Sequence, residues 1–80
     1  MASRDEIFAL VSEVLRQEFA FDGEDLRLDT HLVDDLDLDS IDAIDMAVRL
    51  EERTGHKFEN EELKAMLTIR DVVDQIEGRP

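Results

Sequence analysis

A serine surrounded by aspartates is the feature of this sequence with the clearest potential for chemistry. Ser40 lies in the run Asp-Asp-Leu-Asp-Leu-Asp-Ser-Ile-Asp, which covers residues 34–42. A hydrolytic serine needs a general base and often sits in a Gly-x-Ser-x-Gly turn, and the sequence offers neither around Ser40. We therefore expect a protein without catalytic activity.

The alternating aspartates Asp35, Asp37 and Asp39 resemble the first ligands of a calcium-binding loop. If Asp35 is the first loop position, the sixth should be glycine and is Ser40, and the twelfth should be glutamate and is Met46. The chain has no cysteine, and its two histidines lack metal-ligand spacing. We expect no specific metal site.

Negative charge dominates the composition, with 22 acidic and 9 basic side chains and a formal net charge of -13. Ten carboxylates lie between Asp22 and Asp45, where Arg27 is the only lysine or arginine. Such a field repels nucleic acid and anionic lipid, so we expect basic protein partners. No apolar run reaches the roughly 18 residues of a membrane span. The first residues do not resemble a signal peptide. We therefore expect a cytoplasmic protein that does not insert into a membrane.

The elements that must position Ser40 are helices. The chain has 80 residues, of which 42% are hydrophobic, and this suits one domain spanning residues 1–80. A capping-box pattern followed by apolar residues at helical spacing predicts a helix from about Arg4 to Phe19. The stretch from Ala20 to Asp39 has no sustained period and predicts a long ordered loop, with a helical turn near Thr30 to Asp35.

A second helix is expected to open at Asp39 and Ser40, which are both good N-cap residues, and to close before Gly55. Its apolar face is expected to consist of Ile41, Ile44, Ala47 and Val48, widened by Ala43, Met46 and Leu50. Its opposite, solvated side is expected to carry Asp42, Asp45, Arg49 and Glu52.

Two further helices follow in the sequence. A short one is predicted from about Asn60, a possible cap, to Met66. The last is predicted to begin after Thr68, which pairs with Asp71 as a cap, and to stop at Gly78. We therefore expect an all-α fold, a small four-helix bundle with three longer helices and one short, and a long loop between the first two.

With these elements in place, the sequence around Ser40 closely resembles the acyl carrier protein family. The resemblance lies in Asp39-Ser40-Ile41, in a preceding Leu-x-x-Asp lead, and in a following acidic helix that ends at Gly55. It extends along the whole chain in the order and spacing of the helices. It implies that Ser40 receives 4'-phosphopantetheine from coenzyme A through a phosphopantetheinyl transferase.

In that family acyl groups are held on the thiol of the arm as thioesters. The resemblance therefore implies a carrier, not an enzyme, that shuttles acyl intermediates between enzymes of fatty acid, polyketide or related acyl biosynthesis. The start of a helix suits such a site, because its unpaired N–H groups and positive dipole end tolerate the phosphodiester charge. We expect the carrier to be a monomer.

The resemblance also implies roles for residues around the arm. Carboxylates that would face basic patches on the transferase, on acyltransferases and on ketosynthases are Asp39, Asp42, Asp45, Glu51 and Glu52. Candidates for lining a shallow acyl pocket are Ile44, Val48, Leu50, Met66 and Ile69.

Five positions depart from the family's usual pattern. Asp37 stands where the family often has glycine, Ile41 where leucine is commoner, and Thr54 where an aromatic residue often precedes the glycine. Arg49 and Arg53 interrupt the usual acidity of the second helix. These departures do not affect the serine, but they do not identify the pathway. A dedicated carrier for a polyketide, polyene or other specialised product remains an alternative to a fatty acid carrier.

Two other functions remain compatible with the sequence. A peptidyl or aminoacyl carrier would share the arm, but it fits the strongly acidic second helix less well. A non-covalent acidic helical adaptor would share the charge but would not need Ser40. A phosphopantetheine adduct on Ser40 separates a carrier from an adaptor.

Overall fold

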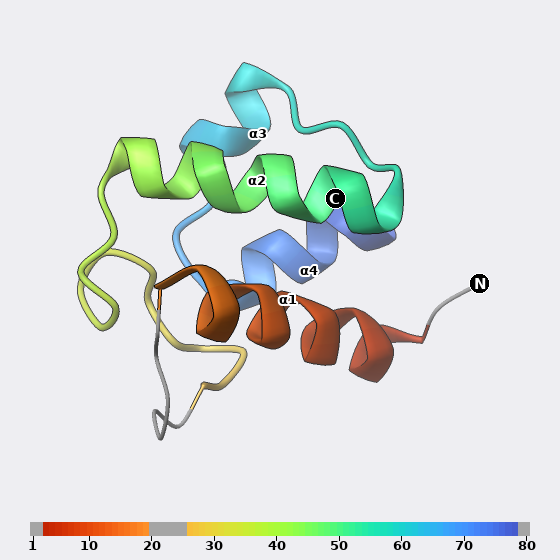
Figure 1. Cartoon of the computed structure of the whole chain (residues 1–80), viewed down its shortest axis with the longest axis horizontal. Helices are drawn as coiled ribbons and strands as arrows, with labels where there is room; N and C mark the ends of the chain where they lie inside the picture. The colour runs from red at the N-terminus through yellow and green to blue at the C-terminus, as the bar shows by residue number, and fades with distance from the viewer. Residues whose placement is uncertain (1–2, 20–25, 79–80) are drawn as a thin grey trace.

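The computed structural model of the chain describes residues 3–19 and 26–78, and these form a bundle of four helices (Figure 1). The helices are α1 (Arg4–Phe19), α2 (Ser40–Thr54), α3 (Asn60–Ala65) and α4 (Ile69–Glu77). Helix α1 packs against both α4 and α2, and α3 packs against α2. The expectation of three longer helices, one short helix and a long first connection is confirmed. Residues 20–25 of that connection lie outside the described residues.

The ends of α2 follow from its capping residues. Oδ1 of Asp39 accepts a hydrogen bond from the Asp42 amide at 2.8 Å, and Oδ2 of Asp42 accepts one from the Asp39 amide at 3.3 Å. Gly55 ends the helix in the left-handed region, at φ 78°, where glycine carries no Cβ penalty. Asp39 is therefore the N-cap, and Ser40 is the first helical residue.

The shorter helices are bounded in similar ways. Thr68 and Asp71 form the capping box of α4 as predicted, and Gly78 ends it at φ 82°. Glu59, not Asn60, occupies the cap position of α3, where it pairs with Glu62. The cap therefore lies one residue before the expected Asn60. Helix α3 ends at Ala65, one residue earlier than predicted.

The core lies where α1, α2 and α4 meet, and it includes apolar residues of the long connection. Its members from the helices are Ile7, Val11, Val14, Leu15, Met46, Ala47, Leu50, Ile69, Val72 and Val73. Its members from the connections are Leu26, Leu32, Leu36, Leu38, Phe58 and Met66. The leucines of the α1–α2 connection therefore hold it against the bundle, as expected of an ordered loop.

The same connection contains the predicted helical turn. The amide of Asp35 donates to the His31 carbonyl at 2.9 Å, and the amide of Asp37 donates to the Val33 carbonyl at 2.9 Å. An isolated antiparallel bridge between His31 and Thr68 joins this turn to the segment before α4. In residues 3–19 and 26–78, no helix is long and apolar enough to span a bilayer.

The expected apolar face of α2 is partly wrong. Met46, Ala47 and Leu50 are buried, but Ile41 is 73%, Ile44 50% and Val48 49% exposed. Both sets recur at spacings of three and four residues, so each makes a stripe along a helix with 3.6 residues per turn. Periodicity does not decide which of two apolar stripes faces the core. In this protein the stripe that contains Met46 and Leu50 faces the core.

Candidate functional site

Ser40 is exposed at the first position of α2. Because Asp39 supplies the side-chain acceptor of the helix cap, the cap does not depend on the Ser40 hydroxyl. The amides of a first helical turn lack intrahelical partners and carry the positive end of the helix dipole. An anionic ester on Ser40 would therefore lie at a favourable end of the helix.

Ser40 lies at the edge of an apolar groove between α2 and α3. The groove has a volume of about 310 Å³ and is lined by Ser40, Ala43, Ile44, Asn60, Leu63 and Lys64. The α3 residues at this groove were not among the sequence-based candidates. Leu63 and Lys64 belong to a six-residue helix, which is too short for its apolar spacing to indicate which side it presents.

The five acyl-pocket candidates occupy different environments. Ile44 lines the groove beside Ser40, and Val48 is half exposed on the surface of α2. Leu50 and Ile69 are fully buried and Met66 is 6% exposed, all within the core. The structure thus brings one candidate to the groove and three into the packed interior.

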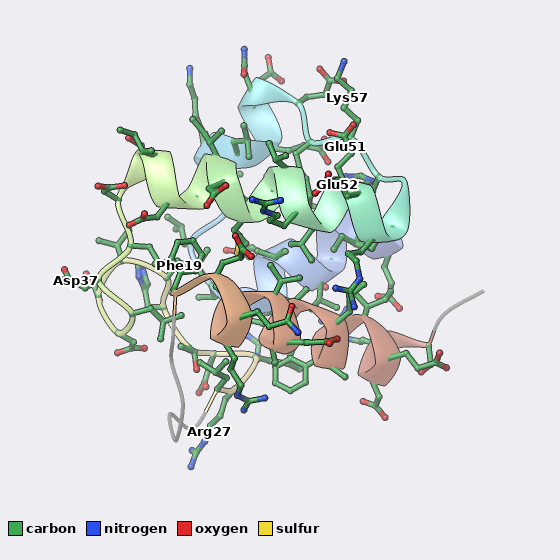
Figure 2. All side chains as sticks on the ribbon, in the orientation of Figure 1. Phe19, Arg27, Asp37, Glu51, Glu52 and Lys57 are labelled. Atoms are coloured by element: carbon green, nitrogen blue, oxygen red, sulfur yellow. The ribbon has the colours of Figure 1, made fainter. Side chains whose placement is uncertain are left out.

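The candidate partner-binding carboxylates divide into two groups. Asp39 and Asp42 bind each other's backbone amides in the capping box, so they also stabilise the start of α2. Asp45, Glu51 and Glu52 are exposed, and Figure 2 shows Glu51 and Glu52 toward the C-terminal end of α2.

The exposed apolar side chains of Ile41, Ile44 and Val48 form a ridge along α2, which begins next to Ser40. Asp45 follows Ile41 by four residues and precedes Val48 by three, so it neighbours both on the helix surface. Sequence reasoning placed this ridge opposite the acidic residues, and the structure places it beside them. The only sequence signal for it is the second apolar stripe on α2.

Two arginines of α2 bind carboxylates of α1. Nε of Arg49 lies 3.0 Å from Oε1 of Glu18, and Nη2 of Arg53 lies 3.1 Å from Oε2 of Glu13. The negative charge of Glu18 and its hydrogen bond, followed by the charge of Glu52, raise the pKa of the Arg49 guanidinium. These contacts account for the two basic departures in an otherwise acidic helix.

Asp37 lies in the loop before Ser40 (Figure 2). Its backbone adopts the left-handed conformation, with φ 59°. This conformation favours glycine, and aspartate is one of the few other residues that tolerate it. The departure from glycine at this position is therefore compatible with the same backbone. Among the described residues, no group of three or more histidine, aspartate or glutamate side chains is placed to hold a metal ion.

These features define a small all-α protein with an exposed serine at the start of an acidic helix. The family model described as a phosphopantetheine attachment site matches residues 5–76. Acyl carrier protein 2 of Ralstonia nicotianae is 38% identical over 73 residues, which cover 91% of this chain and 90% of that protein. The acyl carrier protein of Micrococcus luteus is 37% identical over 78 residues, covering 98% and 96%.

A solved structure of the acyl carrier protein from Thermotoga maritima has the same fold. Its TM-score is 0.82 at 24% identity, with 95% of this chain and 88% of that chain covered. The chain therefore belongs to the acyl carrier protein family. Proteins of this family are carriers rather than enzymes, and their prosthetic group is 4'-phosphopantetheine. An exposed serine hydroxyl at a helix start, beside an apolar groove, fits attachment of that group.

Proposed function

We propose that Ser40 carries the 4'-phosphopantetheine arm, and that the chain holds acyl intermediates on it as thioesters. The arm passes them between enzymes of fatty acid, polyketide or related acyl biosynthesis. The chain has three serines, and the matched region contains Ser12 and Ser40 but not Ser3. Ser12 is only 3% exposed, whereas Ser40 is exposed. The exposure of Ser40 at the start of α2 is the observation that carries the assignment.

The groove between α2 and α3 supports a role in shielding the arm or its cargo. Its lining by Ala43, Ile44 and Leu63 offers apolar surface directly beside the attachment serine. Burial of apolar cargo there would be favoured by about 25 cal/mol for each Å² removed from water. Cargo that extends to Leu50, Met66 or Ile69 would have to displace packed core side chains.

Partner recognition would use the exposed apolar ridge and its acidic border together. Asp45, Glu51 and Glu52 would attract basic patches on the transferase and on acyltransferases or ketosynthases, chiefly by raising the rate of encounter. The ridge of Ile41, Ile44 and Val48 would then supply apolar contact. A carrier that visits several enzymes needs rapid association without slow release.

Intact mass after incubation with a phosphopantetheinyl transferase and coenzyme A tests the assignment. The parent chain should gain the mass of one phosphopantetheine group, and Ser3→Ala should gain the same mass. Ser40→Ala should gain none while keeping its helical circular dichroism. Loading of Ser40→Ala would place the arm elsewhere, and an unloaded parent would favour a non-covalent adaptor.

A further inference from the structure

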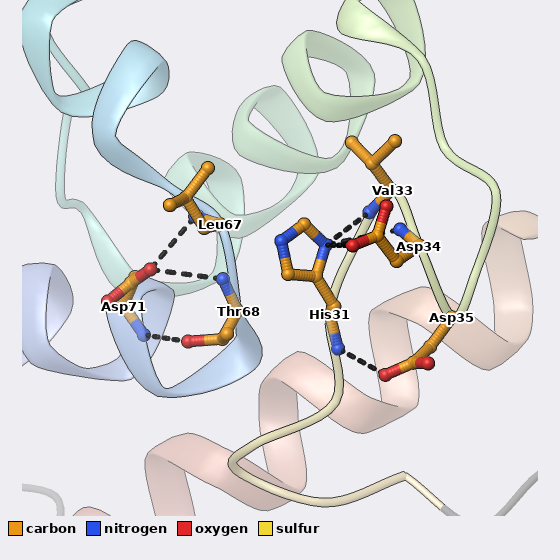
Figure 3. A network of polar contacts seen from close by, with 7 residues as sticks. All are labelled: His31, Val33, Asp34, Asp35, Leu67, Thr68 and Asp71. Carbon is orange, nitrogen blue, oxygen red and sulfur yellow. Dashed lines mark hydrogen bonds and ion pairs between the residues drawn. The ribbon is translucent and has the colours of Figure 1, made fainter.

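The turn that leads into α2 is capped by the imidazole of His31 (Figure 3). Nδ1 of His31 accepts hydrogen bonds from the backbone amides of Val33 at 3.3 Å and Asp34 at 3.1 Å. These are the amides two and three residues after the cap, which an N-cap side chain ordinarily binds. The His31 amide in turn donates to Oδ2 of Asp35 at 2.7 Å. Histidine is not among the residues preferred for this position.

The capped turn determines where the chain enters α2. The His31 carbonyl accepts the amides of Asp35 and Leu36, and the Leu32 carbonyl accepts the amide of Leu38 at 3.0 Å. Leu38, which is 4% exposed, precedes Ser40 by two residues. A shift of the turn would therefore move the backbone immediately before Ser40.

The turn is also held from its other side. The Leu32 amide donates to the Leu67 carbonyl at 2.8 Å, and the Ile69 amide donates to the Thr30 carbonyl at 3.1 Å. Asp71 accepts the amides of Leu67 and Thr68 at the start of α4. The turn that contains His31 is thus bonded to the segment before α4 and leads along the chain into α2.

Nδ1 accepts two amides only when it carries no proton, so the cap requires a neutral ring with its hydrogen on Nε2. A proton on Nδ1 would point at the two amide N–H groups and would remove the acceptor. The carboxylate of Asp34 lies beside the ring, with its Oδ2 3.8 Å from Nδ1, whereas the carboxylate of Asp35 binds the backbone amide of His31. Asp34 therefore offers the protonated ring an ion pair in place of the cap.

We infer that His31 is a positioning residue for Ser40, whose neutral imidazole holds the turn that presents the serine to the transferase. This inference rests on the proposed attachment at Ser40. It predicts that loading depends on an uncharged acceptor at position 31.

The experiment compares the full chain with His31→Asn and His31→Leu. Asparagine keeps an uncharged cap acceptor, and leucine removes the acceptor but keeps an apolar side chain. Initial rates of phosphopantetheine transfer are measured for the parent and for every variant under the same conditions. His56→Asn, between α2 and α3, is the matched control for removal of a histidine.

The parent and His31→Asn should load at similar rates, and His31→Leu up to about fivefold more slowly, which is the full factor by which loss of a typical cap shifts the turn's equilibrium. His56→Asn should load at the parent's rate. Equal rates for the parent and both His31 variants would overturn the inference and leave the proposed function standing. Failure of the parent to load would refute the proposed function itself.

Discussion

Asp39 and Ser40 are expected to have different roles, Asp39 in the stability of α2 and Ser40 in attachment of the arm. Substitutions at each residue test this. In the structure Asp39 supplies the cap acceptor for α2, at 2.8 Å from the Asp42 amide, and Ser40 only begins the helix. Ser40→Ala should therefore change the free energy of unfolding by less than about 0.5 kcal/mol, as exposed substitutions usually do. Loading with phosphopantetheine should be abolished.

Asp39→Ala should instead lose stability, while its intact Ser40 hydroxyl should still accept the arm. Loss of an N-cap side chain costs about 0.5 to 2 kcal/mol, and each kcal/mol lowers the Tm by about 4 to 8 °C in a domain of this size. Asp39→Asn is the matched control, because asparagine caps a helix as well as aspartate does but removes the charge. Its stability should stay close to that of the parent.

Thermal and urea unfolding, followed by circular dichroism, measure these differences directly. The reasoning predicts the stability order Ser40→Ala and Asp39→Asn near the parent, with Asp39→Ala clearly below them. A larger loss in Ser40→Ala than in Asp39→Ala would refute it, because Ser40 would then be the residue that caps the helix.

Three further predictions concern the surface around Ser40. Asp37→Gly should leave stability unchanged or raise it by up to about 1 kcal/mol, whereas Asp37→Val should lower it by about 1 to 2 kcal/mol, because φ 59° is costly for a β-branched residue; urea unfolding measures both. Ile44→Ser should slow loading with little change in Tm, because the side chain is 50% exposed and lies on the exposed ridge; unchanged loading would exclude the ridge from docking. Asp45→Lys should slow loading mainly through association, and the defect should shrink as salt rises; a defect independent of salt would contradict electrostatic attraction.

The boundaries of α1, α2 and α4 were predictable because short-range chemistry sets them. Capping pairs such as Thr68 with Asp71, and terminal glycines such as Gly55, act within a few residues of each other, so the sequence displays them directly. Ser40 was predictable as a candidate for the same reason. Its family resemblance depends on the neighbouring residues and not on a distant contact.

The surface around the site was harder to predict because it depends on how the helices pack. Helix α2 carries two apolar stripes, and only contact with α1 and the core decides that Leu50 is buried and Ile44 exposed. The groove beside Ser40 needs Leu63 from another helix. The cap formed by His31 was also missed, because a histidine in a loop gives no sign of which groups its ring will accept.

The positions of Arg49 and Arg53 explain how α2 presents exposed carboxylates although it also carries cations. Arg53 pairs with Glu13 and Arg49 with Glu18, so both guanidinium groups reach toward α1. Arg49 also lies 3.5 Å from Glu52, which makes Glu52 the partly neutralised member of the acidic set. Asp45 and Glu51 are exposed on α2, near the apolar ridge. The two arginines that depart from the usual acidity of this helix therefore join α2 to α1. They leave carboxylates exposed beside the apolar ridge, where the proposed basic partner would meet them.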